Sequence, residues 1–369
     1  MLALTDPWAG HDALRGRTVL LAMSGGVDSS AAAVLLQRRG ARVLGLTMKN
    51  FCYSDVEDGG NTSCCSLSHL LDARRVCEVL GIEHFLLDAT RLFGRLVIDR
   101  FVSEYEVGRT PNPCVDCNQL VRFPLLVARA RELGASLVAT GHYARSGRDA
   151  AGRHFVRRGV DASKDQSYFL HGVPHDCLEC CVFPLGDLEK SEARRVAREA
   201  GLPVAEKPES QEICFLPAGG RGTFLEERGS PRQGELVDVG GTRLGAHRGI
   251  GNFTVGQRRG LNVAVGRPLY VQRIEAETDT VVLGDVPSLG SGGIEIDHVW
   301  LGGEFPPGKL GVQVRYRSAP AAVREIVRTG GRALVRFASP QRAVAPGQAA
   351  VLYGGDAVVG GGRIAAPLE

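Results

Sequence analysis

Long apolar runs, a large net charge and a leader-like beginning are all missing from this 369-residue chain. The first apolar run, residues 19–23, is far too short to cross a membrane. Residues 1–10 are mixed in character, without the basic-then-apolar layout of a secretion signal. We therefore expect a cytoplasmic protein with no membrane association. With 44% hydrophobic and 23% charged residues, wholesale disorder is excluded, and the length predicts two or three domains.

A net charge of +3 is too small to indicate a nucleic-acid-binding protein by itself. The distribution of charge is more informative, because residues 309–342 contain eight Lys or Arg and a single acidic residue. Such a basic segment suits a polyanionic partner. It is equally typical of a solvated face of a β domain, so the charge alone leaves both interpretations open.

Periodicity divides the chain into two kinds of structure. Apolar runs at 19–23, 43–48, 85–88 and 137–140 predict buried strands, and helical patterns at 70–80, 125–133 and 188–200 alternate with them. This alternation predicts an α/β fold with a parallel sheet covered by helices on both faces. From about residue 232 the chain is rich in Gly and Val, with short alternating strands. We expect domains at 1–207, 208–287 and 288–369, the last two mainly β.

The segment 22–30, Ala-Met-Ser-Gly-Gly-Val-Asp-Ser-Ser, follows an apolar run and opens an alanine-rich helical pattern. The two glycines permit a tight turn close to an anion, and the free N–H groups of the following helix favour phosphate there. Asp28 would repel a bare phosphate, so we assign it to a Mg²⁺ ion on that phosphate. The segment lacks the Gly-Lys-Ser/Thr and Gly-x-Gly-x-x-Gly signatures. It resembles instead the PP-loop of ATP pyrophosphatases, which cleave ATP to AMP and pyrophosphate while adenylating a carbonyl oxygen; a tight turn that binds nothing is the alternative.

Ten cysteines are many for a cytosolic chain and direct attention to metal, cluster or redox chemistry. Residues 109–118 read Arg-Thr-Pro-Asn-Pro-Cys-Val-Asp-Cys-Asn, and the two prolines predict a fixed loop with a helix starting only near Leu120. Cys117 would then lie close to a helix N-terminus, which lowers the pKa of a thiol and favours a nucleophile. Cys214, between Ile213 and Phe215, would on its own be read as a small buried hydrophobe.

Taken in order, the motifs resemble the tRNA-specific 2-thiouridylase family over nearly the whole chain. The matching segments are 23–30, 108–118, Ala139-Thr140-Gly141-His142-Tyr143, Lys164-Asp165-Gln166-Ser167-Tyr168-Phe169, Ile213-Cys214-Phe215, 254–260 and Arg315-Tyr316-Arg317. The resemblance implies a PP-loop domain of the adenine nucleotide alpha-hydrolase type, followed by two smaller mainly β domains. The last of these is expected to be barrel-like and to bind tRNA.

The resemblance also implies a reaction. ATP would adenylate oxygen 2 of the wobble uridine, a persulfide on Cys214 would deliver sulfur, and Cys117 would act as partner nucleophile, leaving a Cys117–Cys214 disulfide to be reduced. It assigns ATP contacts to Ala22, Met23, Ser24, Gly25, Gly26, Val27, Asp28, Ser29, Met48 and Gly141. It assigns base or tRNA contacts to Asn112, Pro113, Cys114, His142, Lys164, Asp165, Gln166, Arg315, Tyr316 and Gln348.

One departure from the family pattern opens a second mechanism. Many relatives carry Asp where this chain has Cys114, so that Cys114, Cys117 and Cys214 together could hold a [4Fe-4S] cluster with one iron open to hydrosulfide. A zinc site with three sulfurs and no nearby histidine fits less well. Cys177, Cys180 and Cys181 have helical spacing and are interpreted as packing residues, with metal binding as a minor alternative; Cys64 and Cys65 receive no role.

The expected partners follow from the same resemblance: tRNA of the Glu, Gln and Lys isoacceptors, and a sulfur-relay protein or cysteine desulfurase, acting on a monomer. Two rival functions remain. Another PP-loop ligase, adenylating a small metabolite, would have no use for the three cysteines or the basic segment. A tRNA-binding module without catalysis would bind tRNA independently of ATP and of Asp28.

Overall fold

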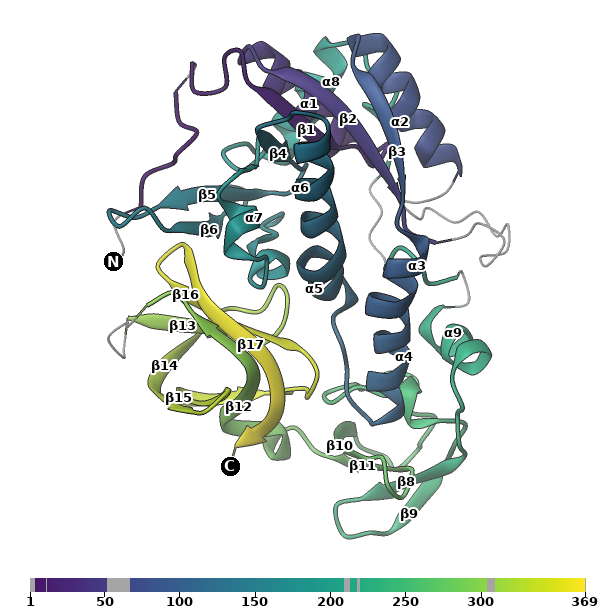
Figure 1. Ribbon diagram of the computed structural model, residues 1–369. Coiled ribbons are helices and arrows are strands. Elements are labelled where there is room, and N and C mark those ends of the chain that lie inside the picture. The colour runs from purple at the N-terminus through teal and green to yellow at the C-terminus, as the bar shows by residue number, and fades with distance from the viewer. Residues whose placement is uncertain are drawn as a thin grey trace. The chain divides into compact units, whose positions relative to one another are not determined.

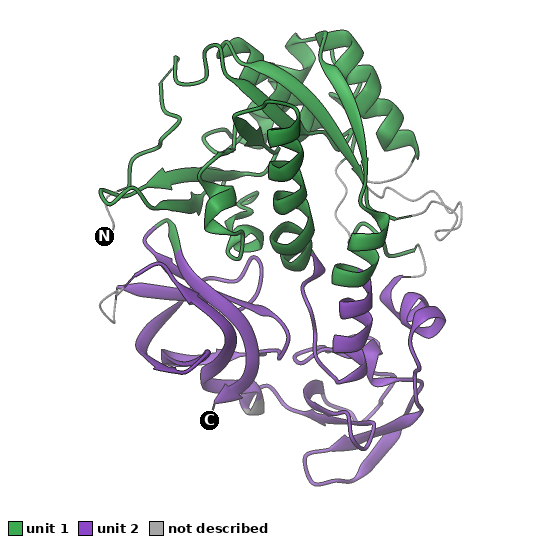
Figure 2. Ribbon diagram, in the orientation of Figure 1, with its two compact units in different colours: residues 1–97, 114–218, 356–358 green, residues 98–113, 219–355, 359–369 purple. Residues whose placement is uncertain are grey.

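The computed structural model describes residues 4–10, 12–51, 67–208, 213–217, 220–303 and 309–368; Cys52, Cys64 and Cys65 lie outside these ranges. The chain divides into two units (Figure 2). Unit 1 comprises residues 1–97, 114–218 and 356–358, and unit 2 comprises residues 98–113, 219–355 and 359–369. The expected division at 207 and 287 stays a prediction.

Unit 1 is built on a five-stranded parallel sheet, which confirms the predicted α/β class (Figure 1). Its order is β3-β2-β1-β4-β7, with β1 (Thr18–Ala22), β2 (Arg42–Lys49), β3 (Glu83–Asp88), β4 (Leu137–Ala139) and β7 (Cys181–Val182). An antiparallel hairpin follows β4, made of β5 (Ala144–Arg148) and β6 (His154–Arg158). The strands form at nearly the predicted positions because continuous apolar runs suit strands that are covered on both faces.

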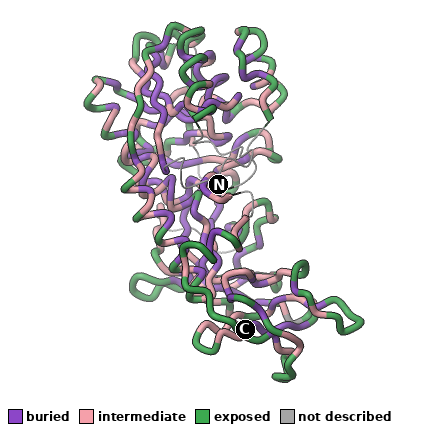
Figure 3. Tube along the Cα trace, turned by 90° about the vertical axis from the view of Figure 1, so that its right-hand side faces the viewer, coloured by how far each residue is buried: buried purple, intermediate pink, exposed green. Residues whose placement is uncertain are grey.

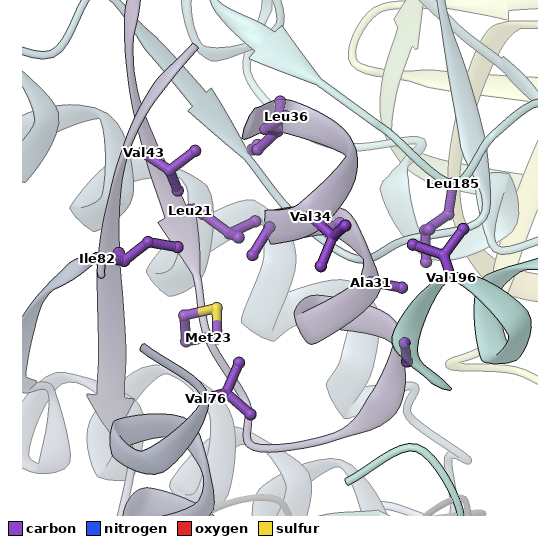
Figure 4. Close-up of a cluster of buried hydrophobic side chains, with 14 of the residues drawn as sticks. Leu21, Met23, Ala31, Val34, Leu36, Val43, Val76, Ile82, Leu185 and Val196 are labelled. Atoms are coloured by element: carbon purple, nitrogen blue, oxygen red, sulfur yellow. The ribbon is translucent and has the colours of Figure 1, made fainter. Parts of the chain in front are cut away.

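The helical elements of unit 1 are α1 (Val27–Arg38), α2 (Leu67–Leu80), α3 (Thr90–Phe93), α5 (Pro113–Asp116), the π-helical η3 (Cys117–Arg122), α6 (Phe123–Glu132), the 3-10 turn η4 (Ser167–Leu170), α7 (His175–Leu178) and α8 (Lys190–Glu199). In the core, Leu21 and Val43 from the sheet meet Val34 of α1, and Val196 of α8 packs on the other side of α1 (Figure 4). The alanine run of α1 lets α8 approach it closely, because small side chains keep the helices near each other.

The strand order places a topological switch point between β1 and β4. These two strands are neighbours in the sheet, yet β1 connects outward to β2 and β4 lies on the opposite side of β1. Ligands of open parallel sheets bind in the crevice at the carboxyl ends of such strands. Here those ends lead directly into residues 23–26 and 140–143, which contain most of the loop and the Gly141 to which the resemblance assigned ATP contacts.

Two local predictions were wrong. The loop expected up to Leu120 is helical from Pro113 onward, because proline is well suited to the first position of a helix, where its missing N–H is not needed. The helical spacing of Cys177, Cys180 and Cys181 does not correspond to one helix: α7 ends at Leu178, and Cys181 already belongs to β7.

Unit 2 is mainly β, as predicted. A four-stranded sheet has the order β10-β11-β8-β9, with β8 (Gly234–Asp238), β9 (Arg243–His247), β10 (Tyr270–Glu275) and β11 (Thr280–Gly284). Six further strands are β12 (Gly290–Leu301), β13 (Leu310–Gln313), β14 (Ala321–Thr329), β15 (Arg332–Arg342), β16 (Ala349–Gly354) and β17 (Ala357–Leu368). They close into a barrel, since β12 pairs with both β15 and β17.

The remaining helical elements are η2 (Gly94–Ile98), which crosses the unit boundary, and, in unit 2, α4 (Asp99–Glu106), α9 (Gly220–Arg228), η5 (Ile250–Asn252) and η6 (Pro287–Leu289). Buried residues recur at every second position at the start of β14 and in the first half of β15, as expected for strands with one face toward the core. Figure 3 shows how buried and exposed residues are distributed along the chain. Within the described residues, no helix is both long and apolar enough to cross a membrane.

Part of the positive charge of the basic segment 309–342 is paired with acidic side chains on the barrel strands. Arg332 pairs with Glu295 of the neighbouring strand at 2.8 Å, and Arg336 lies 3.4 Å from Glu325. Other cations of the segment, among them Arg324 and Arg328, are exposed on β14. The local excess of positive charge is therefore smaller than the sequence count indicated.

Candidate active site

The predicted phosphate loop connects β1 to α1 and is closed by its own serines. The Ser24 N–H donates to Ser29 Oγ at 3.1 Å, and the Ser30 hydroxyl donates to the Gly26 carbonyl at 2.8 Å. Gly25 has a φ of +70°, and Gly26 precedes α1 in an extended conformation. These bonds hold the loop directly before the first N–H groups of α1, which is the arrangement that binds phosphate.

Gly25 cannot carry a side chain without displacing backbone. A Cβ at Gly25 would lie 2.0 Å from the carbonyl oxygen of His69 on α2, whereas a Cβ at Gly81, also left-handed at φ +64°, would meet nothing within 4 Å. We expect Gly81→Ala to lower the free energy of unfolding by about 1–2 kcal/mol, because alanine is strained in the left-handed backbone conformation. Gly25→Ala adds the clash with the His69 carbonyl, and we expect it to lower the free energy of unfolding by at least about 3 kcal/mol. Urea unfolding of both variants measures the difference, and equal losses would contradict the close approach of α2.

Asp28, in the first turn of α1, is held by two donors on the same oxygen. Tyr143 donates its hydroxyl to Asp28 Oδ1 at 2.9 Å, and Lys190 Nζ donates to the same atom at 2.7 Å. The Lys190 side chain is only 11% exposed and lies at the start of α8. A carboxylate and an ammonium group are therefore both fixed beside the phosphate loop.

A second lysine reaches the loop from the segment after α8. Lys207 Nζ donates to the Gly25 carbonyl at 3.2 Å and pairs with Asp72 of α2 at 2.6 Å. Arg194 holds this segment by donating to the carbonyls of Ala205 and Lys207. Sequence analysis missed both lysines, because Lys190 and Lys207 lie 162 and 182 residues from their partners in the loop and belong to no motif.

The segment after β4 lies against the start of α1. A Cβ at Gly141 would sit 2.8 Å from the backbone nitrogen of Ser29, so only glycine allows this approach. Met48, the other predicted ATP contact outside the loop, is half-buried at the end of β2. Its neighbour Thr47 donates a hydrogen bond to the Met23 carbonyl at 2.9 Å, which ties β2 to the start of the loop.

His142 connects this segment to the helix of Cys117. Arg122 Nη1 lies 3.4 Å from His142 Nε2, and it also donates to Asn118 Oδ1 at 2.8 Å. Because arginine can only donate, Nε2 is the acceptor and the proton sits on Nδ1, which donates to Thr140 Oγ1 at 2.7 Å. Desolvation and the Arg122 charge lower the pKa of His142 to about 3, so the ring is neutral at physiological pH.

The lowered pKa values of His142 and His171 predict how the free energy of unfolding depends on pH. Burial also lowers the pKa of His171 to about 4, against 6.5 for an ordinary histidine. Between pH 6.5 and 4 the unfolded chain therefore takes up protons that the folded protein does not, and the free energy of unfolding falls as the pH is lowered. Each such histidine contributes a slope of about 1.4 kcal/mol per pH unit well below 6.5.

His171→Gln is expected to remove one of these contributions. The measurement is urea unfolding of the original chain and the variant across the acid range. The slope of the unfolding free energy against pH gives the number of protons taken up on unfolding, and this number should be smaller by about one in the variant. An unchanged slope would contradict a neutral, buried His171.

Residues 164–166, which the resemblance assigned to tRNA contacts, lie in unit 1 next to the segment that carries His142 and Tyr143. Asp165 is buried and accepts hydrogen bonds from Arg158, from Ser167 and from the Gly159 N–H. The Gln166 side-chain oxygen accepts a hydrogen bond from the Tyr143 backbone N–H at 3.0 Å. The backbone N–H of Gln166 donates to the Tyr143 carbonyl. Lys164, beside them, is half-buried. Asp165 and Gln166 thus hold the segment that carries His142 and Tyr143.

Cys117 and Cys214 belong to segments that pack on the same short helix. Cys117 is buried at the start of η3, which lies against α3. Cys214 is half-buried in a turn closed by the Leu216 N–H and the Ile213 carbonyl, and its neighbour Phe215 packs edge-on against Phe93 of α3, with ring centroids 5.9 Å apart. Segments about a hundred residues apart therefore both lie against α3.

The structure fits a cluster held by Cys114, Cys117 and Cys214 less well than it fits the pairing of Cys117 with Cys214. Cys114 is exposed and Cys117 is buried, although they share one helical run. Across the described parts of the chain, which include Cys114, Cys117 and Cys214, no group of three or more His, Cys, Asp or Glu side chains is placed to hold a metal ion. In this conformation Cys114, Cys117 and Cys214 do not form a cluster site.

Unit 2 contains the other predicted contacts. Gln348 donates to the Thr110 carbonyl at 2.9 Å, so it supports the backbone just before Asn112, which is half-buried, and Pro113, which is buried. Arg315 is exposed and donates to the Val255 carbonyl at 3.3 Å. Tyr316 is half-buried beneath the guanidinium group of Arg317, 5.3 Å from the ring centroid.

Comparison with known proteins gives consistent matches along the chain. Residues 17–218 match the model of the tRNA methyl transferase HUP domain, residues 222–285 that of the tRNA methyl transferase PRC-barrel domain, and residues 293–364 that of the aminomethyltransferase beta-barrel domain. The chain is 47% identical over 359 residues to the tRNA-specific 2-thiouridylase MnmA of Geobacter metallireducens, covering 95% of this chain and 98% of that protein. The protein of the same name from Heliobacterium modesticaldum is 45% identical over 360 residues, covering 95% and 93%.

Proposed function

Because this chain belongs to the tRNA-specific 2-thiouridylase family, we propose that it replaces oxygen 2 of the wobble uridine of tRNA by sulfur, using ATP. The observation that carries the proposal is the continuous set of contacts within unit 1 that joins the phosphate loop to the helix of Cys117. It runs from Ser29 through Gly141 and His142 to Arg122. These contacts support the proposal, because the loop that would activate an oxygen and the helix that would handle sulfur then belong to one unit.

In the activation step, the loop from Ala22 to Ser29 binds the phosphates of ATP through the backbone N–H groups at the start of α1. Met48 and Gly141 complete the nucleotide contacts. Oxygen 2 of the uridine attacks the α-phosphate, pyrophosphate leaves, and the adenylated oxygen becomes part of a good leaving group, AMP. The neutral His142 cannot serve as a cation in this step, so its role is to position Arg122 and Gly141.

The negative charge of the leaving pyrophosphate needs compensation that the loop itself does not contain. Lys190, already fixed 2.7 Å from Asp28, supplies a positive charge at the start of α8. Asp28 has the hard oxygen donors that Mg²⁺ prefers, and a Mg²⁺ ion bound there would neutralise the phosphate oxygens. Lys207, bound to Asp72 and to the Gly25 carbonyl, acts as a brace that keeps the loop in shape.

In the transfer step, the terminal sulfur of a Cys214 persulfide attacks carbon 2 of the adenylated uridine, and AMP departs with the former oxygen 2. Cys117 then attacks the sulfur of Cys214, breaking its bond to the transferred sulfur. The products are 2-thiouridine and a Cys117–Cys214 disulfide, which an external dithiol reduces. The packing of both cysteine segments against α3 supports this pairing.

The tRNA is held by contacts that do not read its sequence. We assign them to Lys164 in unit 1 and to Arg315, Tyr316 and the exposed cations of β14 in unit 2, while Asn112, Pro113 and Cys114 contact the base. Asp165, Gln166 and Gln348 support these segments through the hydrogen bonds described above. Isoacceptors for Glu, Gln and Lys, and a sulfur-relay protein or cysteine desulfurase, are the proposed partners.

The proposal is tested with purified protein, ATP and unmodified tRNA. Pyrophosphate release should require tRNA, and 2-thiouridine should appear when a persulfide donor is added. A noncatalytic tRNA-binding module would release no pyrophosphate. A ligase for a small metabolite would release it without tRNA once its metabolite is present, and either result would overturn the proposal.

The role of Lys190 makes a separate prediction. Lys190→Gln is expected to slow tRNA-dependent pyrophosphate release by about 10²-fold, the loss typical of one charged or hydrogen-bonding group at a developing charge. Arg38→Gln is the matched control, since Arg38 lies at the far end of α1 and pairs with Glu199 on the surface. Equal rates for the two variants would contradict a phosphate contact for Lys190.

A further inference from the structure

Three cysteines outside the proposed site meet where α7 turns into β7. Cys180 donates its N–H to the Cys177 carbonyl at 3.4 Å, which makes residues 177–180 a single turn. The thiols of Cys180 and Cys181 both donate to the same carbonyl oxygen, at 3.3 and 2.9 Å. Two of the sulfur atoms therefore lie beside the backbone oxygen of the third cysteine, and nothing in the proposed thiolation uses these residues.

These cysteines differ in their access to solvent. Cys177 and Cys181 are buried, whereas Cys180 is half-exposed. Burial raises the pKa of Cys177 to about 12 and that of Cys181 well above its usual range. The pKa of Cys180 is lowered, chiefly by the neighbouring Cys181 thiol, which can donate its proton to the Cys180 sulfur in place of the Cys177 carbonyl. Arg131 also lowers it, since α6, which carries Arg131, packs on α7.

An accessible sulfur with a stabilised thiolate beside a second thiol is the arrangement of peroxide-sensitive cysteines. We propose that Cys180 is such a thiol and that Cys177 resolves its oxidised form. The Cys180 thiolate attacks hydrogen peroxide, the O–O bond breaks, and Cys180 sulfenic acid and hydroxide form. The Cys177 sulfur then displaces hydroxide from Cys180, an S–S bond forms, and the two protons released complete two waters. The two thiols lose two electrons, and the peroxide gains them.

Backbone geometry favours Cys177 over Cys181 as the resolving thiol. Residues at the ends of one turn have their Cα atoms within about 7 Å, which is compatible with a disulfide. A bridge between the adjacent residues Cys180 and Cys181 would distort the peptide between them. That peptide is held in place, since its carbonyl, that of Cys180, accepts the Val138 N–H of β4 at 2.9 Å. The next peptide is held as well, because the Cys181 carbonyl accepts Trp8 Nε1 at 2.7 Å.

The test uses the full chain, reduced, treated with limiting hydrogen peroxide, alkylated and cleaved on the carboxyl side of glutamate. Cleavage after Glu179 separates Cys177 from Cys180 and Cys181, so a Cys177–Cys180 disulfide joins two peptides, whereas a Cys180–Cys181 bridge stays inside one. We expect the joined peptides in the original chain and in Cys181→Ser, and their loss in Cys180→Ser. In Cys177→Ser, dimedone should label Cys180.

Three outcomes would overturn the proposal: a bridge confined to the Cys180–Cys181 peptide, joined peptides that persist in Cys180→Ser, or oxidation of Cys180 no faster than that of the exposed Cys114 in the same sample. Urea unfolding of each reduced variant establishes that it is folded before oxidation. The thiolation assay plays no part in this test, so its result is independent of the proposed function.

Discussion

Cys117→Ser is expected to abolish 2-thiouridine formation while tRNA-dependent pyrophosphate release continues. The hydroxyl of serine is neither a soft nucleophile nor able to form the disulfide that ends the transfer step. Thiouridine should therefore fall by about a thousandfold or more, as is usual when a reacting group is removed. Adenylation uses the phosphate loop and Lys190, which the substitution does not touch. The measurement is nucleoside mass spectrometry of the tRNA beside a pyrophosphate assay on the same sample.

Cys114→Ser is the matched control, because Cys114 lies on the same helical run but is exposed. Cys114 is a proposed base contact, but serine keeps a small polar side chain there, so with a persulfide donor this variant should still form thiouridine and lose far less activity than Cys117→Ser. If it loses activity as completely as Cys117→Ser, and anaerobically purified protein contains iron and sulfide that the variant lacks, the persulfide route is wrong and a cluster on the three cysteines replaces it. Loss of pyrophosphate release in Cys117→Ser would contradict the separation of the two steps.

Asp28→Asn is expected to have the second largest effect, and on the other step. The substitution keeps the shape of the side chain but removes the charge that faces Lys190 and that would bind Mg²⁺. Pyrophosphate release should fall by about 10²- to 10³-fold, and thiouridine formation should fall with it because no adenylate is made. Steady-state kinetics at saturating ATP measures the loss.

Tyr143→Phe is the control for Asp28→Asn. It removes the other hydrogen bond to the same carboxylate oxygen, at 2.9 Å, without changing the charge. The rate should then fall by less than about tenfold, in line with roughly 1 kcal/mol for a single hydrogen bond. If both variants are equally impaired, the charge of Asp28 is not what matters. If Asp28→Asn retains full activity, its role beside the phosphates is wrong.

Local patterns were sufficient for the sheet and the phosphate loop. A buried strand, two glycines and a helix start lie within a few residues of each other, so their geometry follows from the chain itself. Pro113 shows where local rules conflict: proline stiffens a loop, yet it also begins helices, and the second role prevailed. The pairing of Cys117 with Cys214 came from the family resemblance, since Cys214 alone carries no signal.

The lysines of the site could not have been predicted from local pattern. Lys190 and Lys207 reach the loop only because α8 packs on α1 and because Arg194 holds the following segment. Their partners are set by tertiary packing, which no spacing records. The same holds for Arg332, which pairs with Glu295. The two residues are 37 positions apart in the sequence but lie on neighbouring strands of the barrel, β15 and β12.

The fate of oxygen 2 of the uridine distinguishes adenylation from any other route to 2-thiouridine. Unmodified tRNA is prepared with a heavy oxygen isotope at position 2 of the wobble uridine and incubated with the protein, ATP and a persulfide donor. Adenylation of that oxygen predicts one heavy atom in the phosphate of every AMP released, in equal amount to the thiouridine formed. Heavy isotope released into water, with unlabelled AMP, would contradict activation of the uridine by this phosphate loop.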